Sequence, residues 1–214
     1  GVVINKFRML PLESIKMILA GYAWEAPILD LITIAAALQL KSDMSAERDS
    51  DPDASLLEFC SDIDLDHKNQ SCESSSKMSL MTSCDFCAML LAWDKYQRLC
   101  AGILEEVIAT PESLDKEGIG NLHGRIVEWC KEQNVSPKYF EDLTQRREDI
   151  IHNMAGIGLN PYAWNNKSLS NNIELNIHDW TKLIKQCIFD GYKSNILVWN
   201  PAVSSYETRF GNIK

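Results

Sequence analysis

Apolar residues recur every three or four positions through most of the chain, and this period predicts a series of helices. The first helix is expected over residues 12–22, with one apolar face formed by Leu12, Ile15, Ile18, Leu19 and Tyr22. A second helix is expected over residues 27–38, where Pro27 suits the first turn. The period returns after residue 82 and predicts further helices over residues 83–100, 122–130, 136–154 and 177–189.

The two ends of the chain have a different pattern. Residues 1–10 alternate weakly between apolar and polar side chains up to Pro11, and residues 196–199 and 203–210 are rich in residues that favour strands. We therefore predict a mainly α protein, a helical bundle with short β segments at both ends.

Residues 41–79 interrupt the helical pattern and carry most of the negative charge. The whole chain has a formal net charge of −9, and residues 43–73 alone hold ten acidic and two basic side chains, a net charge of −8. The segment is also rich in serine, so we predict a mobile acidic insertion that buries little surface. Because the rest of the chain is close to neutral, the global charge excludes neither nucleic acid nor protein as a partner.

Composition favours a folded intracellular domain. The chain has 214 residues, of which 45% are apolar, and this is enough for a sizeable core. Its seven cysteines are an odd number in mostly apolar contexts, which favours reduced thiols. No apolar run is long enough to cross a bilayer, and we expect no membrane partner. Since the first residue is Gly and not Met, we expect that the sequence begins inside a longer polypeptide.

The signatures of common catalytic sites are absent from the sequence. There is no phosphate-binding G-x-x-x-x-G-K-[ST] loop, no Asp-Glu-x-His pattern and no G-x-S-x-G elbow. The four histidines are scattered along the chain. We therefore predict no catalytic residue and no cofactor in this stretch.

Two segments contain possible metal ligands. Residues 62–73 place carboxylates at the spacing of an EF-hand loop, but His67 stands where that loop needs glycine, so a solvated acidic segment is the better interpretation. Residues 84–87 form a C-x-x-C pair that could bind zinc together with Cys60, His67 or Cys72. Since Cys87 lies among apolar residues of a predicted helix, we favour a structural thiol and predict no metal site.

Basic and aromatic side chains offer candidates for nucleic-acid binding. Lys138, Arg146 and Arg147 share one predicted helix, and three lysines lie on or just after the last one, Lys182, Lys185 and Lys193. Basic side chains on a helix can bind a phosphate backbone, although an ordinary charged outer face is the plainer interpretation. Three aromatic side chains could stack on bases, but their apolar neighbours favour a place in the core: Trp93, Trp129 and Tyr139.

Several segments, in order, resemble the region that follows the motor domains in DEAH/RHA-type (DExH) RNA helicases of superfamily 2. These segments are Met9–Gly21, Ile28–Leu38, Asp85–Tyr96, Trp129–Ser136, Arg147–Ile151, Lys185–Asn195 and Tyr206–Thr208. The sequence departs from the family at Phe86, where the family has His, and at Ile151, where it has Arg. These departures and the acidic insertion suggest a divergent member from a large DNA virus.

The resemblance implies an architecture. Residues 1–40 would hold a winged-helix remnant and the first bundle helices, residues 41–79 the insertion, residues 80–195 a ratchet-like helical bundle, and residues 196–214 the start of an OB-fold-like sheet. In this family the bundle packs on two RecA-like motor domains of the same polypeptide, which use ATP or another NTP with Mg²⁺. The chain itself would be non-catalytic.

The resemblance also implies a partner and a location. The bundle helps to form the channel for single-stranded RNA or DNA, and we expect Ser136, Lys138, Arg146 and Arg147 to contact the strand backbone. A viral member would act in the host cytoplasm, the virion or the nucleus. The main alternative is a helical protein–protein adaptor whose acidic segment binds a partner.

Overall fold

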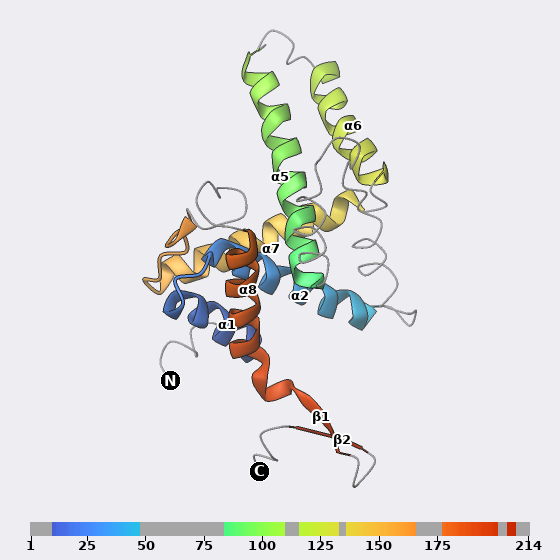
Figure 1. Cartoon of the computed structure of the whole chain (residues 1–214). Helices are drawn as coiled ribbons and strands as arrows, with labels where there is room; N and C mark the ends of the chain where they lie inside the picture. Colours follow the sequence, from blue (N-terminus) through green and yellow to red (C-terminus); the bar gives the residue numbers. More distant parts are fainter. Residues whose placement is uncertain are drawn as a thin grey trace. The chain divides into compact units, whose positions relative to one another are not determined.

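The computed structural model describes residues 10–47, 84–109, 116–132, 136–165, 177–200 and 205–208, and most of them are helical (Figure 1). The helices are α1 (Leu12–Ala23), α2 (Ile28–Glu47), α5 (Asp85–Ala109), α6 (Lys116–Glu132), α7 (Pro137–Gly156) and α8 (Ile177–Tyr192). A 3₁₀ turn, η5 (Lys193–Asn195), leads into two antiparallel strands, β1 (Leu197–Asn200) and β2 (Ser205–Thr208), in which Leu197 is opposite Thr208. The prediction of a mainly α protein is confirmed.

The chain divides into two compact units. Unit 1 comprises residues 1–35 and 150–214, and unit 2 comprises residues 36–149. The boundaries between the units fall inside α2 and α7. The predicted domain limits and the OB-fold assignment of the last residues remain predictions.

Some predicted elements are longer in the structure, and others lie outside the described residues. Helix α2 continues to Glu47, into the predicted acidic insertion, and α6 begins at Lys116, six positions before its expected start. Helix α5 continues to Ala109 without a break. Residues 1–9 of the first predicted β segment and most of the insertion fall outside the described residues.

The end of α7 follows the glycines that the sequence places there. Gly158 has a φ of 80°, its N–H donates to the Ala155 carbonyl at 3.0 Å, and the Leu159 N–H donates to the Met154 carbonyl at 3.0 Å. This pair of bonds is the Schellman arrangement, which needs a left-handed residue at the Gly158 position. Gly158 therefore fixes where α7 ends.

In unit 1, α1 and α8 pack closely where Gly191 faces α1 (Figure 1). A Cβ atom on Gly191 would lie 2.7 Å from the Glu13 carbonyl oxygen and 2.7 Å from the Met17 Cβ. Beside this contact, the hydroxyls of Ser14 and Tyr192 share a hydrogen bond of 3.0 Å. The absence of a side chain at Gly191 therefore sets how closely the two helices approach.

The inward face of α1 differs from the predicted one. Ser14, Met17 and Gly21 are buried, whereas Leu12 is 42% exposed. The apolar pattern placed Leu12 inward because it gave no weight to small and polar residues. The face is turned toward Ser14 and Gly21, because Ser14 bonds across to Tyr192 and Gly21 leaves room for the Leu31 side chain.

A buried polar pair joins α2 to α8 in unit 1. The indole N–H of Trp180, which is fully buried, donates to Oδ2 of Asp30 at 2.8 Å, and Asp30 is only 7% exposed. A buried carboxylate is costly unless hydrogen bonds satisfy it, so this bond supports the burial of Asp30. It also fixes which side of α8 faces the core.

We expect Gly191→Ala to lower the free energy of unfolding by about 1–3 kcal/mol, because the new Cβ would press on the backbone and Cβ of α1. The matched control is Gly102→Ala on α5, where a Cβ would meet nothing within 4 Å. This change should be neutral or stabilising by up to about 1 kcal/mol. Urea denaturation followed by circular dichroism measures both. Equal effects of the two substitutions would contradict the packing argument.

Candidate nucleic-acid interface

The first turn of α7 presents two of the predicted site residues to solvent. Ser136 directly precedes the helix, and its carbonyl accepts the Tyr139 N–H at 3.0 Å. Ser136 and Lys138 are both exposed, and Lys138 forms no ion pair with another described residue. The start of a helix is the weakly positive end of its dipole, and Lys138 adds a full positive charge there.

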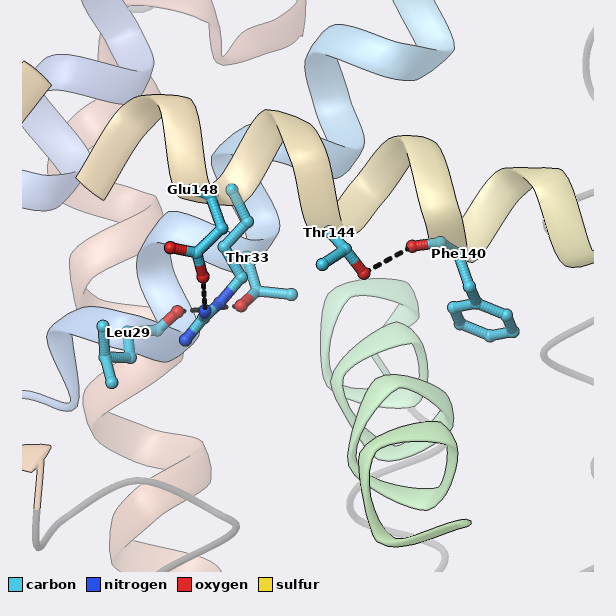
Figure 2. Close-up of polar contacts among 6 residues, drawn as sticks. Leu29, Thr33, Phe140, Thr144 and Glu148 are labelled. Atoms are coloured by element: carbon cyan, nitrogen blue, oxygen red, sulfur yellow. Dashed lines mark hydrogen bonds and ion pairs between the residues drawn. The ribbon is translucent and has the colours of Figure 1, made fainter. Parts of the chain in front are cut away.

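Arg147 is held inside unit 2 by an aromatic ring. Its side chain is 17% exposed, and its Cζ lies 5.9 Å from the centroid of the Trp93 ring. Its Nη1 lies 3.3 Å from Oε1 of Glu148, the ion pair drawn at Glu148 in Figure 2. Contact with the face of tryptophan stabilises a guanidinium. Arg147 is therefore engaged within the unit.

The four predicted residues do not share one face of α7. Nine positions separate Lys138 from Arg147, which is two and a half turns, so the two side chains leave opposite sides of the helix. Arg146 lies between these directions and is partly exposed. The structure thus brings Ser136 and Lys138 together, sets Arg146 to one side and places Arg147 against Trp93. Their role in backbone contact remains a prediction.

Aromatic rings from α5, α6 and α7 form the core of unit 2 around Phe140. The Phe140 ring stacks on Tyr96 with centroids 4.4 Å apart, and lies 6.0 Å from Trp129 and 6.4 Å from Trp93. Trp93 is 7% exposed and Tyr96 is 8% exposed. The core interpretation is confirmed for Trp93, whose ring is covered and cannot stack on a base. Next to Phe140, the Thr144 hydroxyl donates to its carbonyl at 2.7 Å (Figure 2).

Two other basic residues of unit 2, Arg98 and Arg125, form ion pairs. Arg98 Nε lies 2.9 Å from Oδ2 of Asp94, one turn earlier on α5. Arg125 on α6 binds both carboxylate oxygens of Glu106 on α5, and this hydrogen bonding lowers the pKa of Glu106. Paired charges offer less to an incoming phosphate than Lys138 does.

The described cysteines behave as structural thiols. None of the five forms a disulfide with another described cysteine, and Cys87, Cys130 and Cys187 are buried. Burial raises the pKa of the Cys187 thiol to about 12 and also raises that of Cys130, so both stay protonated near neutral pH.

The metal candidates of the sequence lie mostly outside the described residues. Residues 62–73 are among those not described, as are Cys60 and Cys72. Within the part that the structure describes, no group of three histidine, cysteine or acidic side chains is placed to hold a metal ion. No helix in this part is long and apolar enough to span a membrane.

Comparison with known proteins finds viral relatives. The chain is 24% identical over 226 residues to proteins named "Putative RNA Helicase B962L" from Kenyan and South African isolates of African swine fever virus, and 25% identical to the protein of that name from a Malawian isolate. The alignment covers 99% of this chain and 21% of each relative, so the chain spans about a fifth of their length. No family model and no solved structure matches the chain.

The relatives support the broad part of the family resemblance and leave its finer part untested. They support similarity to a viral protein related to helicases, as the sequence predicts. The finer assignment, to the region after the motor domains of a DExH helicase, remains a prediction.

We expect Arg147→Gln to lower the free energy of unfolding by about 0.5–2 kcal/mol, because it removes the cation from the Trp93 face. Lys138→Gln on the same helix is the control and should change stability by less than about 0.5 kcal/mol, since Lys138 is exposed. Urea denaturation of the two variants beside the parent chain gives the comparison. A stable Arg147→Gln variant would show that the guanidinium is not a structural group.

Proposed function

We propose that this chain is a non-catalytic accessory region of a viral NTP-dependent helicase that guides single-stranded RNA or DNA. The observation that carries the proposal is the similarity along 99% of the chain to one fifth of proteins named as RNA helicases. A region that aligns end to end, and that lacks the phosphate-binding and DExH motifs, fits an accessory part better than a motor.

The motor chemistry would lie elsewhere in the polypeptide. ATP or another NTP, together with Mg²⁺, would bind to RecA-like domains outside these residues, and this helical region would pack on them. Hydrolysis would then move the strand past a surface that this chain contributes. Such a surface needs to hold a backbone without reading its sequence, which is what exposed basic residues do.

The start of α7 is the part of the predicted site best suited to a phosphate. Ser136 offers a hydroxyl donor, Lys138 an exposed ammonium group, and the helix start the positive end of its dipole. Arg146 adds a second, partly exposed cation on an adjacent side of the helix. In this proposal Arg147 acts indirectly, because its contact with Trp93 helps to fix α7 within unit 2.

A second candidate function is that of a protein–protein adaptor. Leu104 and Ile108 lie one turn apart on α5 and are 58% and 70% exposed. Neighbouring exposed apolar residues are a common feature of interaction surfaces. An adaptor would bind no nucleic acid in a salt-dependent way, so one binding experiment separates the two functions.

We expect the 214-residue chain to bind labelled single-stranded RNA with an affinity that falls as salt rises. The logarithm of affinity should fall against the logarithm of salt concentration by about 0.7 for each phosphate contact. Lys138→Gln and Arg146→Gln should each reduce that slope by about 0.7 and weaken binding at low salt. Fluorescence anisotropy across a potassium chloride series measures affinity and slope together.

The control is Lys131→Gln, which removes one exposed charge from α6 in the same unit. It should leave the slope unchanged. Equal losses for Lys131→Gln and Lys138→Gln would indicate a general effect of charge and reject the α7 site. Absence of RNA binding by the parent chain at low salt would favour the adaptor function.

A further inference from the structure

Two cysteines lie on neighbouring helices of unit 2, where α5 and α6 run side by side (Figure 1). Cys100 lies on α5 and is partly exposed, whereas Cys130 lies on α6 and is fully buried. Cα atoms of the two helices come within 8 Å of each other. The two thiols thus belong to helices that are already in contact.

A ring contact shows which parts of the two helices face each other. The ring centroids of Tyr96 on α5 and Trp129 on α6 are 6.3 Å apart. Cys100 follows Tyr96 by one turn, so it continues the same face of α5. On the other helix, Cys130 directly follows Trp129. Both cysteines therefore lie within about one turn of the contact between the rings.

An ion pair farther along the helices shows that α5 and α6 stay together beyond Cys100. Arg125 on α6 donates from Nη2 to Oε1 of Glu106 on α5 at 3.3 Å. Glu106 follows Cys100 in the chain, whereas Arg125 precedes Cys130, so the two helices run in opposite directions. Cys100 therefore lies between two contacts that join its helix to α6.

The electrostatics of the site agree with this placement. Burial raises the pKa of the Cys130 thiol, and the charge of the Cys100 thiolate raises it further. Burial also raises the pKa of the Tyr96 hydroxyl, and the charge of Cys100, a hydrogen bond with Cys100 and the charge of Cys130 add to this shift. The two thiols therefore lie on either side of one buried hydroxyl, close enough to influence each other.

We propose that Cys100 and Cys130 form a reversible disulfide that joins α5 to α6 under oxidising conditions, with a low-molecular-weight disulfide such as oxidised glutathione as the oxidant. Cys100 is the thiol that such an oxidant reaches first, because it is partly exposed. The buried Cys130 meets only sulfur atoms inside the unit, so it acts as the resolving thiol. This modification is independent of nucleic-acid binding.

The bond forms by two exchange steps. The Cys100 thiol loses a proton, and its thiolate attacks one sulfur of oxidised glutathione to give a mixed disulfide and one glutathione thiolate, which takes up a proton. The Cys130 thiol then loses its proton and attacks the Cys100 sulfur, and a second glutathione leaves and is protonated. Two protein thiols are thereby oxidised to one disulfide, and one oxidised glutathione is reduced to two molecules of glutathione.

The cross-link would hold α5 and α6 together. A disulfide needs Cα atoms about 4.4–6.8 Å apart, so the bond would keep the helices at or inside the approach that they already make. It would also close a loop between residues 100 and 130, which restricts the unfolded chain. We therefore expect the oxidised chain to melt about 5–10 °C above the reduced chain.

The test is mass spectrometry of the folded 214-residue chain after incubation with oxidised glutathione. The intact mass should fall by about 2 Da, because two hydrogen atoms leave. Trypsin cleaves after Arg98, Lys116, Arg125 and Lys131, so each of the two cysteines lies alone in its peptide. Without reduction, peptides 99–116 and 126–131 should be recovered joined. Dithiothreitol should separate them and restore the melting temperature of the reduced chain.

Three variants make the outcomes separable. Cys100→Ser and Cys130→Ser should each abolish the joined peptides and the rise in melting temperature. Because Cys130 is buried, its substitution can also weaken the fold, so the decisive variant is Cys100→Ser, whose side chain is partly exposed. Cys84→Ser is the matched control: it removes another partly exposed thiol next to α5 and should leave the cross-link intact. Circular dichroism checks that each variant is folded.

Several results would overturn the proposal. One is that glutathione stays attached to Cys100 without a cross-link to Cys130. Another is that the cross-link forms only in urea, which would show that the folded chain keeps the thiols apart. A disulfide that joins Cys100 to any other cysteine would reject the pair. A cross-link that leaves the melting temperature unchanged would reject its role in holding α5 to α6.

Discussion

The close approach of α1 and α8 at Gly191 is the constraint on which unit 1 depends. No side chain other than hydrogen fits between the backbone of α8 and the Glu13 carbonyl. Once the helices meet at this distance, the hydroxyls of Ser14 and Tyr192 come within hydrogen-bonding range, and Trp180 reaches Asp30 on α2. These contacts set the rotation of α8, and its rotation decides which of its side chains face the solvent.

Long amphipathic helices could be predicted from the sequence, and rotations set by small residues could not. The helix over residues 136–154 was expected from its apolar period, and Phe140, Leu143 and Met154 are buried along it. The face of α1 was not, because a serine and a glycine pack inward for reasons that lie on another helix. The period of apolar residues describes only the helix that carries it and not the helix packed against it. The sequence of α1 alone therefore does not reveal the hydrogen bond with the Tyr192 hydroxyl or the space that a glycine leaves for a neighbouring side chain.

The candidate site shows the same division. The sequence placed Lys138 and Arg147 on one helix, but their separation of nine positions already implied opposite sides. That signal was present in the spacing and was not used. The contact of Arg147 with Trp93 could not be read from the sequence, because it depends on how α5 packs on α7 within unit 2. Basic side chains on the same helix thus differ in their surroundings: Arg147 packs against Trp93, whereas Lys138 is exposed to solvent.

The separation of structural from solvent-facing charges bears on function. Asp30 and Arg147 are tied to tryptophans, and Asp94 is buried against Arg98, so the fold itself uses these charges. Lys138 and Lys182 are exposed, and no packing of the described residues requires their charge. In a chain with an overall charge of −9, such lysines lessen the repulsion among acidic side chains even where they form no ion pair. Their substitution removes none of the contacts that pack the helices, so it can test the proposed binding of an anionic strand apart from the packed charges of the fold.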